Sequence, residues 1–250
     1  MLKVRVMPCL TIKNKRLVKS VQFDEHRNIG SYVAAARVFN GRDVDEMVVL
    51  DLDAREQGID PLILQEITKE CFMPLAVGGG VKTLEDVQRL LDLGADKVVV
   101  NSGALARPEL IQEASARFGA QCVVVSIDAK RIGETWEVFA EGGQRATGLE
   151  AVVWAKQAEG LGAGEIFLTS IDQDGMMEGY DTGLIEAISQ AVRIPVIASG
   201  GAGKPEHAFA AVRAGASAVC AASVFQYTQV TPANFKEFLA KNGVDMRASN

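Results

Sequence analysis

Two glycine-rich segments, each followed by small polar residues, could bind phosphate groups. Residues 76–105 read AVGGGVKTLEDVQRLLDLGADKVVVNSGAL, and residues 197–225 read IASGGAGKPEHAFAAVRAGASAVCAASVF. Backbone N–H groups at glycine turns can bind an anion without side-chain charge, because glycine allows close approach. We therefore interpret each segment as an anion cradle. Taken singly, the glycines could equally serve only tight turns.

The two segments align with each other when the numbering is shifted by 121 residues. The shift places Gly79-Gly80 on Gly200-Gly201, Asn101-Ser102 on Ala222-Ser223, and Asp51 and Asp53 on Asp172 and Asp174. One shift that fits three separate places indicates an internal duplication. The sequence therefore predicts two related halves, about residues 1–120 and 121–250, and a substrate with two phosphates, one bound by each half.

Asp128 is the candidate for proton transfer. It follows the strongly apolar run Gln121–Ile127, where an unpaired carboxylate is costly. A carboxyl group in such surroundings can have a shifted pKa, which suits a general acid or base. A buried aspartate that caps the following turn is the structural alternative, and we favour the acid–base role.

Four charged residues stand at or just before the starts of apolar runs: Arg5, Glu46, Lys97 and Glu165. Two charges of each sign could form a ring at one end of a barrel. From the residue types alone, a solvated rim of salt bridges is the simpler interpretation.

The bulk composition indicates a globular chain with a sizeable core. Of 250 residues, 48% are hydrophobic and 23% charged, and the formal charge of −6 argues against a general nucleic-acid binder. We expect neither a signal peptide nor a membrane span, and so a cytoplasmic location. The scattered cysteines predict reduced thiols, and the two isolated histidines make a zinc site improbable. No metal and no cofactor are expected.

Alternating apolar and amphipathic segments predict eight β–α units. The expected strands are Val4–Leu10, Met47–Leu50, Pro74–Val77, Val98–Val100, Gln121–Ile127, Ile166–Ser170, Pro195–Ala198 and Ala218–Ala221. Continuous apolar strands are typical of a parallel sheet that is buried on both faces. We therefore predict one α/β domain over residues 1–250, a (β/α)₈ barrel, with a doubly wound open sheet as the structural competitor.

The remaining expectations concern loops and helix starts. Thr11–Ile29 is polar and basic and is predicted to be a long functional loop, whereas Thr135–Ala140 alternates and predicts a small hairpin insertion. Capping or helix-opening residues are expected at Ser31, Asp60-Pro61, Thr83 with Asp86, Pro108, Thr147 with Glu150, Asp181, Pro205 and Pro232.

Several motifs resemble the cyclase subunit of imidazole glycerol phosphate synthase, in the histidine-biosynthesis barrel family. They are LAVGGGVKTLEDVQRLL, VVSIDAKR, LTSIDQDG and IPVIASGGAG, within a match from Val4 to about Leu239. The resemblance implies a barrel of two similar halves with a glutaminase subunit (HisH type) docked on its bottom. Ammonia would pass through the barrel and attack a bis-phosphorylated ribulosyl aminoimidazole carboxamide, giving imidazole glycerol phosphate and an aminoimidazole carboxamide ribotide.

The resemblance also implies roles for individual residues. Asp128 matches a catalytic aspartate, Lys19 a substrate-contacting lysine, and Asp96 an aspartate that faces the glutaminase. The phosphate contacts would be Gly80, Asn101 and Ser102 on one side, and Asp174, Gly175, Gly201, Ala222 and Ser223 on the other. The matching gate of the ammonia entrance is Arg5, Glu46, Lys97 and Glu165, so the resemblance favours a gate over a solvated rim.

One position departs from the family pattern. Thr11 stands where the family has its other catalytic aspartate, and threonine has no carboxyl group for acid–base chemistry. The first loop is also altered at Asn14-Lys15-Arg16, where the family usually has an Asp-Gly turn.

A branch of the family shares the loss of this aspartate and the run Leu17-Val18-Lys19. Its members accompany a glutaminase and a sugar-amidating enzyme that converts an acetamido sugar to an acetamidino sugar in surface-polysaccharide pathways. We expect membership in this branch first. The alternatives are an authentic cyclase that uses another carboxylate, such as Asp51 or Asp174, and a non-catalytic scaffold that activates the glutaminase.

Overall fold

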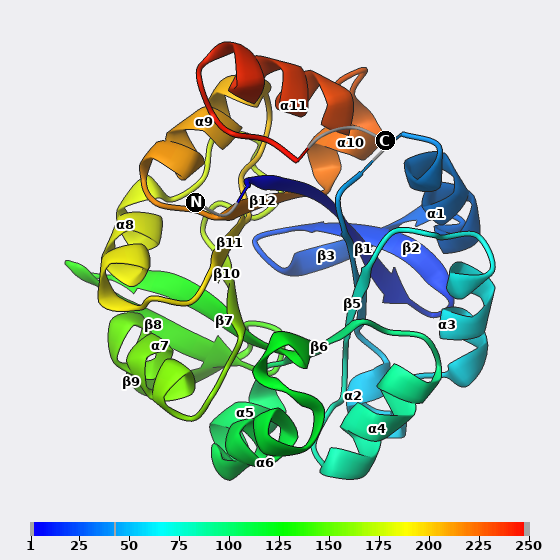
Figure 1. Cartoon of the computed structure of the whole chain (residues 1–250), viewed down its shortest axis with the longest axis vertical. Coiled ribbons are helices and arrows are strands. Elements are labelled where there is room, and N and C mark those ends of the chain that lie inside the picture. Colours follow the sequence, from blue (N-terminus) through cyan, green and yellow to red (C-terminus); the bar gives the residue numbers. More distant parts are fainter. Residues whose placement is uncertain (1–2, 43, 248–250) are drawn as a thin grey trace.

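Eight parallel strands form a closed barrel in the computed structural model, which describes residues 3–42 and 44–247 (Figure 1). The order around the barrel is β1, β4, β5, β6, β7, β10, β11, β12, and β12 pairs with β1. Their bounds are Arg5–Lys13, Met47–Asp51, Leu75–Gly78, Lys97–Val100, Val123–Ile132, Glu165–Ser170, Val196–Ser199 and Ala218–Ala221. Since β7 also pairs with β10, the sheet has no free edge at this point, and the open-sheet alternative is wrong. The predicted (β/α)₈ barrel, an α/β fold, is confirmed.

The helices surround the strands (Figure 1). In the described part of the chain they are α1 Tyr32–Asn40, α2 Ala54–Gln57, α3 Pro61–Thr68, α4 Leu84–Asp92, α5 Ser102–Ala106, α6 Glu109–Phe118, α7 Ala151–Gly160, α8 Thr182–Ala191, α9 Pro205–Arg213, α10 Ser223–Tyr227 and α11 Pro232–Lys241, with a 3₁₀ turn at Ala120–Cys122. No helix among these residues is long and apolar enough to cross a membrane. The predicted halves contribute β1, β4, β5 and β6, and β7, β10, β11 and β12, but the duplication itself stays a prediction.

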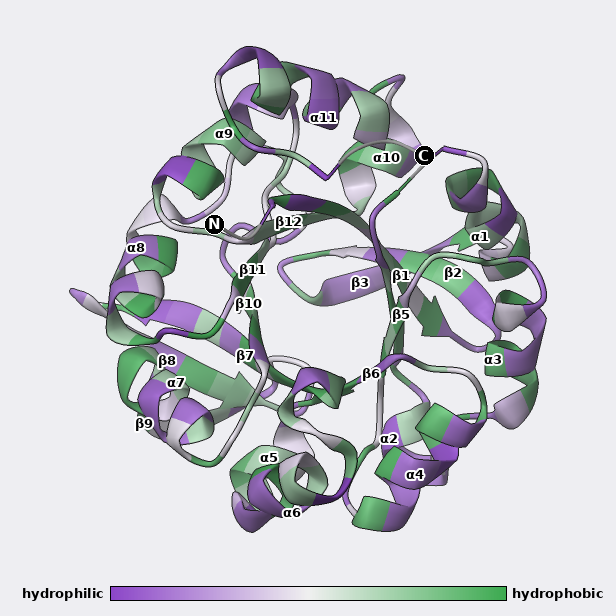
Figure 2. Ribbon diagram, viewed as in Figure 1, coloured by the Kyte–Doolittle hydropathy of each residue, from purple (hydrophilic) through white to green (hydrophobic). Residues whose placement is uncertain are grey.

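Two apolar cores explain why the strands read as continuous hydrophobic runs. One core lies between the strands and the helices. The other fills the barrel and includes Met7, Val48, Ala76, Val124 and Phe167. In Figure 2 the central ring of strands is mostly hydrophobic, while the helices mix both kinds of residue. Each barrel strand is thus buried on both of its faces, as parallel strands covered by helices are.

Four of the eight predicted helix starts are confirmed by side-chain caps, from Ser31, Asp60, Thr83 and Asp181. Thr83 and Asp86 form a reciprocal capping box at α4, and Asp181 accepts a hydrogen bond from the Leu184 N–H at α8. The predicted capping box of Thr147 and Glu150 is wrong. The Thr147 hydroxyl instead donates to the Val138 carbonyl, 2.6 Å away, because it lies in a strand.

The first polar segment is not the predicted loop. Strand β1 continues to Lys13, and β2 (Arg16–Val21) and β3 (Asp24–Gly30) follow it as antiparallel strands. Asn14 and Lys15 have φ angles of 51° and 53°, which suit the two central residues of a type I′ hairpin turn. Burial of Leu17 and Val18 gives the hairpin its apolar support.

A second hairpin extends β7 beyond the barrel, as predicted. It consists of β8 (Thr135–Ala140) and β9 (Arg145–Glu150), and residues 141–144 join them. The four cysteines are free thiols, of which Cys122 is partly exposed and the others are buried.

Candidate active site

The carboxyl ends of the eight strands meet at one end of the barrel, which we call the mouth. All strands run in the same direction, so residues that follow them gather there even when they are far apart in the sequence. Asp128, Asn101 and Asp174 reach the mouth from β7, from the turn after β6, and from the turn after β10. The opposite end, at the strand starts, is the bottom.

Asp128 is held by two hydrogen bonds at the mouth. The Asn101 side-chain amide donates to Asp128 Oδ2 at 3.0 Å, and the Ser126 hydroxyl donates to Oδ1 at 3.4 Å. Burial raises the pKa of the Asp128 carboxyl to about 7, against the lowering effect of the Ser126 hydrogen bond. A carboxyl with this pKa has both protonated and ionised forms near neutral pH. Asp128 can therefore both give and take a proton.

A chain of hydrogen bonds joins Asp128 to the first cradle, which consists of Gly79, Gly80, Asn101 and Ser102. The Ser102 hydroxyl donates to Asn101 Oδ1 at 3.1 Å and accepts from the Glu141 N–H at 3.0 Å. A Cβ at Gly80 would lie 1.9 Å from the Ala54 carbonyl oxygen, so glycine is required here by close backbone packing. Phosphate binding by this cradle stays a prediction.

The second cradle, Gly200, Gly201, Ala222 and Ser223, lines a small cavity together with Asp174 and Gly175. A Cβ at Gly201 would lie 2.0 Å from the Gly179 carbonyl oxygen. A Cβ at Gly175 would lie 2.3 Å from the Ser20 carbonyl oxygen. Glycines and small residues make up most of the cavity lining, so backbone N–H groups are accessible to a ligand there.

The first hairpin brings Lys19 and Ser20 to the mouth. Lys19 is 6% exposed, and its ammonium group donates to the Cys9 carbonyl at 3.3 Å. Burial lowers the pKa of Lys19 and raises the pKa of Asp174 to about 6. The Ser20 hydroxyl donates to Asp174 at 3.4 Å, so the hairpin contacts the second cradle.

Thr11 faces the interior of the barrel, where the missing carboxyl group would be expected. Met7 and Cys9, on the same strand, belong to the core inside the barrel. Because side chains alternate along a strand, Thr11 lies on the same face, closer to the mouth. The structure therefore puts a hydroxyl group there, and no second carboxyl group from β1.

The charged ring at the bottom, here called the gate ring, is a closed set of ion pairs. Arg5 binds Glu46 at 2.6 Å and Glu165 at 3.0 Å, and Lys97 binds the same carboxylates at 2.9 and 3.1 Å. The side chains are only 3–17% exposed, so this is no fully solvated rim. Glu46 Oε1 is buried without a hydrogen-bond partner. The four predicted residues do meet, while their role as an ammonia gate stays a prediction.

Asp96 lies close to the gate ring in sequence but has a structural contact of its own. Its Oδ2 accepts a hydrogen bond from the Leu75 N–H at 2.8 Å, at the start of β5. The residue remains exposed at the bottom. It can therefore orient β5 and still contact a partner.

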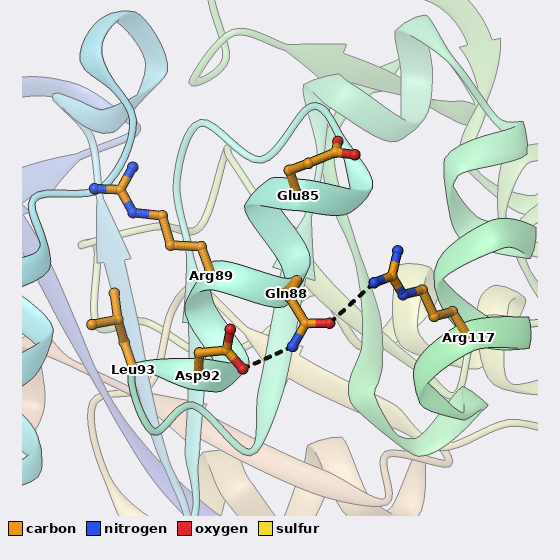
Figure 3. Close-up of a pocket in the computed structure, with 6 residues that line it drawn as sticks. All are labelled: Glu85, Gln88, Arg89, Asp92, Leu93 and Arg117. Carbon is orange, nitrogen blue, oxygen red and sulfur yellow. Dashed lines mark hydrogen bonds between the residues drawn. The ribbon is translucent and has the colours of Figure 1, made fainter.

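A hollow also lies on the outer surface between α4 and α6. Figure 3 shows it lined by Glu85, Gln88, Arg89, Asp92, Leu93 and Arg117, with hydrogen bonds from Gln88 to Asp92 and from Arg117 to Gln88. These are charged and polar groups of helix surfaces. The hollow shares no residue with either cradle or with the gate ring.

Sequence reasoning missed the charged residues beside the first cradle. Glu141 forms ion pairs with Arg55 and Arg145, and the Lys82 ammonium donates to the Arg55 carbonyl at 2.9 Å. The available signal was the run Glu141–Arg145, directly after the predicted hairpin segment Thr135–Ala140. Its partner Arg55 lies 86 positions away and could not be inferred from local spacing.

Comparison with known proteins identifies the family. Residues 5–231 match the histidine biosynthesis protein family. The chain is similar to the imidazole glycerol phosphate synthase subunit HisF of Exiguobacterium sibiricum, with 46% identity over 249 residues, which cover 99% of this chain and 100% of that protein. The chain therefore belongs to the histidine biosynthesis protein family and is of the HisF type.

Proposed function

We propose that this chain is the cyclase subunit of an imidazole glycerol phosphate synthase that receives ammonia from a glutaminase partner. The observation that carries the proposal is the division of the barrel. A closed gate ring lies at the bottom, and Asp128, with a pKa of about 7, lies at the mouth. The similarity to the HisF subunit supports this proposal better than the sugar-amidation branch that the sequence first suggested.

In the proposed reaction, ammonia first enters at the bottom of the barrel and then reacts at the mouth. A glutaminase docked on the bottom releases ammonia beside the gate ring. Neutral ammonia can enter an interior lined by residues such as Met7, Val48 and Val124, where an ammonium ion would pay a large desolvation cost. At the mouth it attacks the ribulosyl substrate, whose two phosphates are held by the two cradles. Asp128 takes and returns protons as the imidazole ring closes and the ribotide leaves.

The threonine at position 11 favours a second candidate function, sugar amidation. Without a carboxyl group at this position, the chain could deliver ammonia to a separate sugar-amidating enzyme and perform no cyclisation itself. The gate ring would then keep its role and the cradles would not need to bind two phosphates. A non-catalytic scaffold that activates the glutaminase is the third possibility. All three functions involve the glutaminase, and only the cyclase requires proton transfer by Asp128.

The proposal is tested by turnover of the ribulosyl substrate with either ammonium salts or glutamine plus the glutaminase. Formation of imidazole glycerol phosphate with both nitrogen sources is expected. No product with either source, from a chain that still stimulates the glutaminase, contradicts the cyclase function and favours sugar amidation or the scaffold.

The gate ring provides a separate prediction. In Lys97→Glu the two buried carboxylates lose a partner and gain a repelling charge. We expect glutamine-dependent turnover to fall by about tenfold or more, while ammonium-dependent turnover at the mouth changes by less than about twofold. Lys156→Glu, on the exposed side of α7, is the matched control. An equal loss with both nitrogen sources would mean damage to the whole barrel and would count against a gate.

A further inference from the structure

The two cradles differ in the charges around them. Three cationic side chains belong to segments that touch the first cradle: Arg55 on α2, Lys82 in the turn after β5, and Arg145 at the start of β9. Among the described residues that line the second cavity, Asp174 is the one charged residue. Lys19, whose charge acts on Asp174 beside the second cavity, is buried, whereas the three cations beside the first cradle are exposed.

A carboxylate already binds two of the cations beside the first cradle. Glu141 Oε2 lies 2.5 Å from Arg55 Nη2, and Glu141 Oε1 lies 2.9 Å from Arg145 Nε. The Arg55 and Arg145 side chains are 48% and 52% exposed, and exposed ion pairs contribute little to stability. The carboxylate can therefore be exchanged for another anion without unfolding the hairpin.

The same groups are fixed to the cradle through their backbones. A Cβ at Gly80 would lie 3.1 Å from the backbone nitrogen of Arg55, and the Glu141 N–H donates to the Ser102 hydroxyl at 3.0 Å. Glu141 also has a φ angle of 63°, which is uncommon for a residue with a side chain. The Glu141 carboxylate thus lies between the two arginines, while its backbone N–H contacts Ser102.

We propose that Arg55, Glu141 and Arg145 form an anion clasp in which a phosphate group at the first cradle replaces the Glu141 carboxylate as the partner of both arginines. The proposal rests on a phosphorylated ligand, as the proposed function does. A phosphate monoester carries more charge than a carboxylate and offers three acceptor oxygens to the guanidinium groups. Glu141 keeps the arginines in place when the site is empty and is released when the phosphate binds.

Calorimetric titration of the full chain with inorganic phosphate at low salt tests the clasp without requiring turnover. Glu141→Gln removes the competing charge and is expected to bind phosphate about fivefold more tightly, whereas Arg55→Ala and Arg145→Ala are expected to bind about tenfold more weakly. Glu70→Gln and Arg37→Ala, which break a comparable ion pair between α1 and the turn after α3, should leave phosphate affinity unchanged.

Two further variants assign the effect to one cradle. In Ser223→Asp a carboxylate repels phosphate from the second cradle, and the effect of Glu141→Gln should persist. In Ser102→Asp the first cradle is blocked, and the effect should vanish. Unchanged or weaker phosphate binding by Glu141→Gln, with Arg55→Ala equal to wild type, overturns the clasp, as does the absence of phosphate binding to the wild type. Phosphate binding with these shifts in a chain that makes no imidazole glycerol phosphate supports the clasp and rejects the proposed function.

Discussion

Asp128→Asn is expected to lower ammonium-dependent turnover of the ribulosyl substrate by about 10²–10⁴-fold, with a much smaller change in KM. Asparagine keeps the shape of the side chain and can still accept the hydrogen bond from Asn101, but it cannot exchange a proton. The substrate should therefore bind while the chemical step fails. Steady-state kinetics over a range of substrate concentrations separates the two effects, and Asp92→Asn on the outer surface of α4 is the control.

The pH dependence of turnover shows whether the protonated or the ionised form of Asp128 acts in the limiting step. With a pKa of about 7, turnover should rise with pH through neutrality if the carboxylate acts as base in the limiting step, and should fall if the acid limits it. Asp128→Asn should abolish this inflection and leave any other one in place. A wild-type profile that is flat between about pH 6 and 8, or an Asp128→Asn variant as active as the wild type, would contradict the acid–base role and favour a scaffold.

Loss of activity in this variant is not expected to come from unfolding. Burial in the folded state raises the pKa of Asp128 from its ordinary value of 3.8 to about 7, so between these pH values the folded chain binds one more proton than the unfolded chain. Stability from this group is therefore complete below the unfolded pKa and is lost as the pH rises through about 7. Asparagine never ionises, so at pH 8 the variant should have a higher Tm than the wild type. A lower Tm would show that the hydrogen bonds of the carboxylate outweigh its burial.

The barrel could be predicted from the sequence because its strongest determinant is local. Each barrel strand contains a short apolar run that is buried on both faces, and four of the predicted runs are followed directly by Asp51, Gly78, Asn101 or Asp128. The gate ring was predictable for the same reason, since its members stand at or just before strand starts. Closed topology then brings Arg5 to Glu165 across 160 positions without any signal of its own.

The parts that could not be predicted depend on pairing between polar segments. The segment Thr11–Ile29 looks like a loop because most of its residues are polar, yet turns with positive φ angles at Asn14-Lys15 and Gln22-Phe23 fold it into antiparallel strands. The clasp depends on a contact between α2 and the β8–β9 loop. Neither the hydrophobic periodicity nor the residue spacing predicts that contact, so only the three-dimensional structure reveals it.

Thr11→Asp is expected to raise ammonium-dependent turnover by about 10²-fold or more, because it adds a second carboxyl group for proton transfer on the face of β1 that points into the barrel. Thr11→Asn is the matched control, since it has the same shape without an ionisable group. A gain in Thr11→Asp that is absent from Thr11→Asn would show that the site binds the substrate correctly and lacks only the acid–base partner.

If the wild type is already fast and Thr11→Asp changes nothing, another carboxylate must replace the missing one, and the structure favours Asp174 over Asp51. Asp174 has a pKa of about 6, and its charge acts on both Lys19 and Asp128, so it shares their part of the mouth. Asp51 instead accepts a hydrogen bond from the Asp53 N–H and acts on Tyr32 of α1, on the helix side. Asp174→Asn should then cost about as much as Asp128→Asn, whereas inactivity of both the wild type and Thr11→Asp would transfer the chemistry to a separate amidating enzyme.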